Sequence, residues 1–248
     1  RKIIKSGLLI GLVLVLASSC EKENTLKEVD DVCTKMEDSN FMKYCYDNFD
    51  VNNDGKVSMQ EAAAVKYMYD MRNVTSLKGI EYFTNITELS CPLNDLTSLD
   101  VSKNTALTYL NCYGNDLISL DVSKNTALVY LDCGANDLTS LDVSKNTALV
   151  CLYCGSNDLT SLDVSKNTAL RDLICYANDL TSLDVSKNTA LEVLECYDND
   201  LTSLDVSKNT ALKSLKCGTK KSTITVYYSS GQPIGNWGIE GENKNVIW

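Results

Sequence analysis

One unit of 21 residues is repeated with little change along most of this chain. Six full copies begin at Leu89, Leu110, Leu131, Leu152, Leu173 and Leu194, and the sixth ends at Ser214. A single copy is too short to bury its own leucines. When copies stack, each covers the apolar side of the next, and a continuous core forms. The repetition therefore predicts an elongated solenoid.

The positions within a copy predict a short strand followed by turns. Leu110 and Cys112 have the same parity on such a strand and point inward, so residues 109, 111 and 113 point outward. Strands of successive copies, stacked at about 4.8 Å, form a parallel sheet on one side. The core side chains of this copy are Leu107, Leu110, Leu117, Leu120 and Val122. Few residues remain for the other side, so we expect turns or 3₁₀ segments around residues 123–127 and modest curvature.

The copies follow the pattern LxxLxCxxNxL, for example at Leu107, Leu110, Cys112, Asn115 and Leu117. This pattern resembles the leucine-rich repeat, with cysteine in one leucine position. A degenerate 22-residue copy precedes the six full ones and a seventh begins after them, so the repeats are expected over residues 67–218. The most similar family is the short, internalin-like class of bacterial leucine-rich repeats, often found on surface lipoproteins. The resemblance implies a repeat solenoid with a parallel β-sheet on its concave face.

Two columns of identical residues accompany the leucines. The asparagines are expected to bond backbone groups where the chain leaves each strand. The cysteines are expected to form an inward ladder of apolar thiols, because a straight column cannot offer a metal the tetrahedral set it needs. Cys151 and Cys154 imitate a CxxC motif but fall on opposite faces of a strand. The columns are Asn94, Asn115, Asn136, Asn157, Asn178 and Asn199, and Cys91, Cys112, Cys133, Cys154, Cys175, Cys196 and Cys217.

The first 20 residues resemble the signal peptide of a bacterial lipoprotein. A basic start is followed by an apolar run over residues 8–17, which is too short to span a membrane. The small residues before Cys20 resemble a lipobox, although Ala17 stands where leucine is usual. The resemblance implies lipidation at Cys20, a tether over residues 21–38 and anchoring in a Gram-negative envelope, in the outer membrane and surface-exposed. The alternative is an ordinary signal peptide with an incidental Cys20.

Residues 50–61, DVNNDGKVSMQE, have the spacing of an EF-hand calcium loop. Side-chain oxygens stand at positions 1, 3, 5, 9 and 12, position 7 offers a backbone carbonyl, and Gly55 stands at the sharp turn. The expected Ca²⁺ ligands are Asp50, Asn52, Asp54, Lys56, Ser58 and Glu61. The alternative is a metal-free turn between two helices. No second loop of this kind follows, which argues against a paired calcium sensor and favours one structural site.

The flanks of this loop predict an EF-hand-like helical cap over residues 39–66. Phe41, Cys45 and Phe49 recur at four-residue steps, as on one face of a helix that begins near Ser39. Ser58 and Glu61 have the spacing of a capping box for an outgoing helix. At the other end, residues 222–228 alternate like a strand, so residues 219–248 are expected to form a β-rich C-terminal cap. Cys33 and Cys45 are a candidate disulfide whose geometry the sequence does not define.

The six copies differ mainly at outward strand positions, whereas the stretch NDLTSLDVSKNTAL is almost constant. Tyrosine-rich surfaces suit recognition, because tyrosine offers a large contact area and one polar group. The expected ligand-binding residues are Tyr109, Asn111, Tyr113, Tyr130, Asp132, Tyr153, Asp172, Ile174, Tyr176, Glu195 and Tyr197. The constant positions Ser123, Lys124, Asn125 and Thr126 are also expected to face solvent. The alternatives are that solvent-facing positions simply drift, or that recent duplication explains the constancy.

Composition narrows the class of function. The chain has no histidine, which excludes imidazole-based triads, and a net charge of −10 disfavours nucleic-acid binding. No insertion interrupts the copies to form a pocket, so we do not expect an enzyme. We expect a lipid-anchored cell-surface protein that binds a protein or glycan ligand through its concave face. The alternative is a non-catalytic envelope scaffold or spacer.

Overall fold

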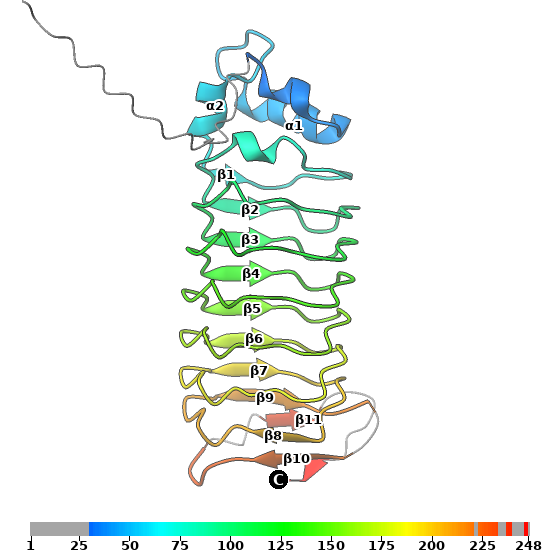
Figure 1. Ribbon diagram of the computed structural model, residues 1–248, viewed down its shortest axis with the longest axis vertical. Coiled ribbons are helices and arrows are strands. Elements are labelled where there is room, and N and C mark those ends of the chain that lie inside the picture. Colours follow the sequence, from blue (N-terminus) through cyan, green and yellow to red (C-terminus); the bar gives the residue numbers. More distant parts are fainter. Residues whose placement is uncertain (1–29, 221–222, 233–236, 240–245, 248) are drawn as a thin grey trace, which may run out of the picture.

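The computed structural model describes residues 30–220, 223–232, 237–239 and 246–247. Within them, the chain forms one long stack of coils with a small helical cap at its N-terminal end (Figure 1). No helix of the described residues is long and apolar enough to cross a membrane. The predicted signal peptide, Cys20 and the first part of the predicted tether lie outside the described residues.

Each coil contributes one short strand to a nine-stranded parallel sheet. Its strands, in spatial order, are β1 (Tyr67–Met68), β2 (Glu88–Ser90), β3 (Tyr109–Asn111), β4 (Tyr130–Asp132), β5 (Cys151–Tyr153), β6 (Asp172–Ile174), β7 (Val193–Glu195), β9 (Ser214–Cys217) and β11 (Trp237–Ile239). From β2 to β7 the register places equivalent residues of neighbouring copies side by side, as with Leu110 and Leu131. The middle residue of these strands is buried and its two neighbours are half-buried. The predicted parallel leucine-rich repeat solenoid is confirmed.

The cysteine column lies entirely inside the stack. All seven thiols, from Cys91 to Cys217, are fully buried beside the leucines. Burial raises the pKa of Cys91 and Cys154 to about 12 and that of Cys217 to about 11. The interpretation as apolar thiols is confirmed, because protonated thiols are poor metal ligands and nucleophiles. Cys33 and Cys45 are buried, and both are free thiols.

The predicted asparagine column completes the backbone hydrogen bonding where the strands end. The Nδ2 of Asn136 donates to the carbonyl oxygens of Cys112, Cys133 and Gly134, each at 3.1 Å. Its Oδ1 accepts the N–H of Leu117 at 3.0 Å. One side chain therefore bonds backbone groups of its own coil and of the coil before it, so the prediction is confirmed.

A second asparagine column lies at the turns, where the prediction for Asn125 is wrong. Asn125 is fully buried rather than solvent-facing, while Lys124 and Thr126 are exposed and Ser123 is half-buried. Two successive turns, with the N–H of Asn125 bonded to Val122 and that of Leu128 to Asn125, direct the asparagine side chain inward. There its Nδ2 donates to carbonyl oxygens of the preceding coil, at 2.9 and 3.0 Å. The column consists of Asn104, Asn125, Asn146, Asn167, Asn188 and Asn209.

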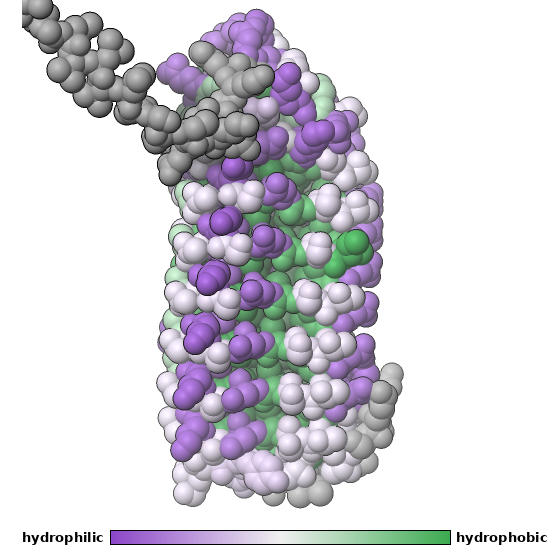
Figure 2. All heavy atoms as spheres, viewed as in Figure 1, coloured by the Kyte–Doolittle hydropathy of each residue, from purple (hydrophilic) through white to green (hydrophobic). Residues whose placement is uncertain are grey.

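Columns of like residues also mark the surface. Figure 2 shows hydrophilic side chains in columns along the length of the stack, beside an apolar stripe. One exposed column consists of Asp100, Asp121, Asp142, Asp163, Asp184 and Asp205. In each case Oδ1 accepts the N–H of the serine two residues later, at 2.8 Å for Asp142. The amide and hydroxyl of Ser144 hold the pKa of Asp142 below its ordinary value.

The helical cap consists of η1 (Val32–Lys35), α1 (Ser39–Phe49) and α2 (Met59–Ala64), and η2 (Ile80–Tyr82) belongs to the first coil. The helix predicted from Ser39 and the capping box of Ser58 and Glu61 are confirmed. The tether predicted for residues 21–38 is wrong at its C-terminal end. Asp31 accepts hydrogen bonds from Tyr46 and from the backbone of Val57, so this segment is part of the cap.

Asp38 joins the cap to the first coil. Its carboxylate accepts the N–H groups of Asn40 and Phe41, both at 2.8 Å, and thereby caps α1. It also accepts the N–H and hydroxyl of Thr75, at 2.7 and 2.8 Å. Burial alone would raise the pKa of Asp38, but these hydrogen bonds outweigh it and hold the pKa below its ordinary value.

The C-terminal segment continues the solenoid by parallel pairing. β10 (Ile224–Tyr227) lies between β8 (Ser203–Asp205) and β12 (Val246–Ile247) in a three-stranded sheet. β11 pairs with β9 at the end of the main sheet. The strand predicted within residues 222–228 is confirmed. In the described residues this cap is built as a further coil rather than as a separate plug.

The two asparagine columns predict different losses of stability. Asn136→Ala removes one acceptor and the donor to three buried carbonyl groups, so we expect it to lower the free energy of unfolding by about 3 kcal/mol. Asn146→Ala leaves two carbonyl groups without this donor, and we expect a loss of about 1–2 kcal/mol. Urea denaturation of both variants measures the difference. Equal losses would contradict the distinct roles of the columns.

Asp38 predicts acid sensitivity of the cap. Because its pKa in the folded state lies below the ordinary 3.8, its contribution is present above that pH and is lost as pH falls through the folded pKa. Asp38→Asn should therefore flatten the fall of the melting temperature between about pH 4 and pH 2. Asp38→Ala should also remove the helix cap, at about 1 kcal/mol near neutral pH. A pH profile of the Asn variant that parallels the wild type would refute the role of the charge.

Candidate functional site: an aromatic sheet face and a calcium-type loop

The outward side chains of β1–β7 and β9 form one continuous surface, which we call the sheet face. It is the surface that the sequence predicts as the concave, ligand-binding side. All of the predicted ligand-binding residues lie on it or directly after its strands. They are half-buried, except that Tyr113 is exposed. The predicted outward orientation is therefore confirmed.

Three tyrosines form a contiguous cluster at the middle of this face. The rings of Tyr109 and Tyr130, which are direct neighbours in the β3–β4 register, stack at 4.4 Å between centroids and 8° between planes. The Tyr153 ring stands almost perpendicular to that of Tyr130, at 5.3 Å and 78°. The cluster therefore presents both an aromatic face and an aromatic edge within three neighbouring coils.

Two glycines explain how further tyrosines reach this cluster. A Cβ on Gly134 would lie 3.3 Å from the Tyr113 ring, and one on Gly155 would lie 3.0 Å from the Tyr176 ring. Each ring therefore covers the glycine of the adjacent coil, and the two rings lean toward each other along the stack. Tyr176 also stacks on Tyr197 at 4.8 Å.

Asp132 lies within the aromatic cluster. Its Oδ1 accepts the N–H of Gly134 at 3.1 Å and lies 3.4 Å from the position of a Cβ on that glycine. Burial raises the pKa of Asp132, although the Gly134 amide and the Tyr130 hydroxyl each lower it in part. No lysine or arginine of the described chain forms an ion pair with it. We call Tyr113, Tyr130, Asp132 and Tyr153 together the Asp132 site.

The C-terminal part of the face has a different electrostatic character. Glu192 forms ion pairs with both Arg171 and Lys213, and Glu195 pairs with Lys216 at 2.9 Å. These pairs join residues of adjacent coils, 21 positions apart. The carboxylates of Glu192 and Glu195 are therefore already neutralised within the protein.

The sequence analysis missed an N-terminal extension of the sheet face. Tyr67 is exposed beside Glu88, and Tyr69 contacts the Glu88 carboxylate through its hydroxyl. Leu93 is 75% exposed and has a φ of 53°, a value that disfavours a leucine side chain. The equivalent residue of the next coil is Gly114, with a φ of 66°. The signal was available in the degenerate copy, whose Tyr67 occupies the position of Tyr109.

The calcium-type loop lies in the cap between α1 and α2. The side-chain oxygens of Asp50 and Asn52 both accept the N–H of Asp54, at 3.2 and 2.9 Å, so they point to one place. Gly55 has a φ of 83°, as the turn at position 6 requires. Val57 is fully buried, and its backbone carbonyl accepts the N–H of Val32. This part of the loop fits the predicted site.

The carboxylate of Glu61, the predicted ligand at position 12, accepts hydrogen bonds from backbone N–H groups of the loop. Its Oε2 accepts from the N–H of Ser58, and its Oε1 from the N–H of Val51 at 3.0 Å. Within the described residues, no three acidic, cysteine or histidine side chains come together as a group able to hold a metal ion. The donor set of three carboxylates, an amide, a hydroxyl and the Lys56 carbonyl is nevertheless all oxygen, which is the chemistry that Ca²⁺ prefers.

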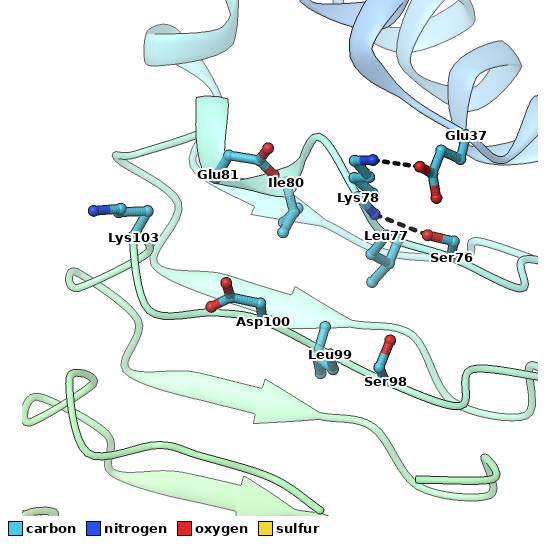
Figure 3. A pocket seen from close by; sticks show the side chains of 10 residues that line it. All are labelled: Glu37, Ser76, Leu77, Lys78, Ile80, Glu81, Ser98, Leu99, Asp100 and Lys103. Atoms are coloured by element: carbon cyan, nitrogen blue, oxygen red, sulfur yellow. Dashed lines mark hydrogen bonds and ion pairs between the residues drawn. The ribbon is translucent and has the colours of Figure 1, made fainter. Parts of the chain in front are cut away.

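A pocket of about 420 Å³ lies where the cap meets the first coils (Figure 3). Lys78 forms an ion pair with Glu37 across it. Glu81 accepts the N–H of Gly79 at 2.8 Å. The ion pair of Lys78 and Glu37 therefore helps to hold the cap on the first coil, and none of the predicted site residues lines this pocket.

Comparison with solved structures places the fold. Internalin C2 from Listeria monocytogenes aligns with a TM-score of 0.69 and 19% identity, over 85% of this chain and 94% of that one. An internalin (inlF) from the same organism aligns with a TM-score of 0.65 and 18% identity, over 87% of this chain and 72% of that one. The chain has the internalin-like leucine-rich repeat fold.

The functional domain of InlJ from Listeria monocytogenes, described as including a cysteine ladder, is 29% identical with a TM-score of 0.40. That alignment covers 88% of this chain, and this chain spans 63% of that structure. No protein-family model matches the sequence, and no curated protein matches it either.

Proposed function

We propose that this protein is a lipid-anchored surface protein of a Gram-negative envelope that binds a protein or glycan ligand through its sheet face. The observation that carries the proposal is the location of the differences among the copies. Coils that are otherwise nearly identical differ where their side chains leave the sheet, and tyrosine is frequent there.

The constancy of the other positions has a partly structural cause. Asn125 and its equivalents are buried and bond the backbone, so they are not free to vary. The exposed Lys124 and Thr126 positions have no such constraint and are also constant. Solvent exposure alone therefore does not account for the differences on the sheet face, which supports a role in recognition.

The anchor rests on the leader sequence. A lipid on Cys20 would hold the tether at the membrane and leave the solenoid free to meet a ligand. The role of the fold is binding rather than catalysis, because the sheet face offers stacked rings and no carboxylate pair set apart for acid–base chemistry. If the sheet face binds no ligand, the alternative function is that of a non-catalytic envelope scaffold or spacer.

We also propose one calcium site in the cap. Asp50, Asn52, Asp54, Ser58 and Glu61 would hold the ion with their side chains and Lys56 with its carbonyl. The ion would supply a fixed positive charge that ties the loop between α1 and α2 together. Val57 links this loop to the backbone of Val32 and its side chain is buried, so order in the loop is transmitted to the cap.

Calcium should raise the melting temperature of the protein. Binding to the folded state alone stabilises it by mass action, and a lone extracellular-type site is expected to need about 10⁻⁴ to 10⁻³ M Ca²⁺. Differential scanning calorimetry with about 10 mM Ca²⁺, about ten times the upper end of that range, and with chelator measures the shift, and isothermal titration calorimetry measures the heat of binding. Asp54→Ala should abolish it, whereas Asp142→Ala, outside the loop, should retain it. No heat of binding together with an unchanged midpoint would refute the site.

Removal of the aromatic surface should abolish ligand binding. The test variant changes Tyr109, Tyr113, Tyr130, Tyr153, Tyr176 and Tyr197 to serine. Binding of wild type and variant is measured on arrays of glycans and extracellular-matrix proteins, and we expect any wild-type signal to fall at least tenfold, because buried interface tyrosines are typical hot spots.

Tyr227→Ser is the matched control, since Tyr227 is an exposed tyrosine of β10 outside the sheet face. Circular dichroism and urea denaturation establish that the variant remains folded. A folded six-site variant that keeps every wild-type signal would favour a spacer over a binding protein.

A further inference from the structure

Charge is distributed unevenly along the sheet face. From β2 to β5, no lysine or arginine occupies an outward strand position or the residue just before a strand. The first is Arg171, before β6, and it is engaged with Glu192. Among the described residues, the outward acidic group of β4 therefore lacks the ion-pair partners that Glu192 and Glu195 have near the C-terminal end of the stack.

Asp132 lies among aromatic rings. Tyr130 precedes it by two residues on the same outward face of β4, and Tyr153 is its direct neighbour in the register with β5. Tyr113 approaches from the adjacent coil over Gly134. A half-buried carboxylate thus lies among three tyrosine rings, and Asp172 nearby accepts only a weak bond from the Cys151 thiol at 3.4 Å.

This combination is complementary to a cation. Tyrosine rings attract an ammonium or guanidinium group through their negatively polarised faces. A carboxylate withdrawn from water is destabilised until a positive charge comes to lie beside it. A neutral sugar would bury Asp132 without compensating its charge, and an anionic ligand would be repelled. The net charge of −10 further favours encounter with a basic partner.

We propose that the sheet face binds a polypeptide that presents an arginine or lysine side chain, and that the Asp132 site holds this side chain. The carboxylate of Asp132 pairs with the cation, and the rings of Tyr130 and Tyr153 contact the cation and its aliphatic stem. The inference rests on the proposed function, because it names the chemistry of the ligand for the same face.

The test uses two small probes that differ in charge but hardly in shape. N-acetyl-arginine amide and its neutral citrulline analogue are titrated into the ¹⁵N-labelled protein and followed by NMR. We expect the arginine probe to bind with a dissociation constant on the order of millimolar. It should shift the amides of residues 130–134 and 153, and the citrulline probe should bind about fivefold more weakly or worse.

Paired variants separate the site from the overall charge. Asp132→Asn should weaken the arginine probe about fivefold, whereas Asp142→Asn makes the same change of charge outside the sheet face and should leave affinity unchanged. Tyr153→Phe keeps the ring and should retain binding, and Tyr153→Ala should lose it. Equal binding of both probes, or an arginine affinity that is indifferent to Asp132→Asn, would overturn the inference.

The two proposals fail in different ways. If the array screen finds a ligand whose binding depends on the six tyrosines but is unaffected by Asp132→Asn, the inferred arginine or lysine contact is wrong and the proposed binding function stands. Binding of a neutral glycan by the sheet face would lead to the same conclusion. If the arginine probe binds at the Asp132 site while no macromolecule on the arrays depends on the tyrosines, the cation site stands and the proposed ligand-binding function fails.

Discussion

No coil of this protein can satisfy its own backbone, and the rest of the structure depends on that constraint. The strands of the repeats are mostly only three residues long, and the turns between them leave carbonyl and amide groups inside the stack. The two asparagine columns bond these groups across neighbouring coils, while the leucines and cysteines fill the space between. Each coil thus depends on the adjacent coils for its hydrogen bonds and its core contacts. Helices cover one end of the stack, and further parallel strands extend the other end.

The same constraint leaves the outward residues of the sheet face free to vary in sequence. Since the inward residues carry stability, side chains that leave the sheet can change from coil to coil without altering the stack. Some rings stack on a ring of the next coil, as Tyr109 does on Tyr130, and others cover a position that has no side chain, as Tyr113 covers Gly134. The ion pairs of Glu192 and Glu195 divide the face into a neutralised C-terminal part and an anionic, aromatic middle.

Most of the fold could be predicted from the sequence, because period and parity alone define the strands, the core and the outward positions. The error at Asn125 has a physical reason, since the orientation of a turn side chain depends on two consecutive turns that periodicity does not describe. The part of the tether that joins the cap was hidden because Asp31 finds its partners, Tyr46 and Val57, far along the chain. The ion pairs across coils were equally hidden, because they require the exact neighbour relations of the sheet register. The lack of an ion-pair partner for Asp132 depends on the same neighbour relations, so it could not be predicted from the sequence either.

The constant register has a consequence for how such a protein can change length. Loss or gain of a whole 21-residue copy between the cap and the aromatic middle keeps the strand register and the core contacts, and it moves the aromatic middle relative to the helical cap in steps of about 4.8 Å. Recombination between near-identical copies can therefore change the distance between the recognition surface and the end of the solenoid in fixed steps, without any change in the structure of the surface or of the cap.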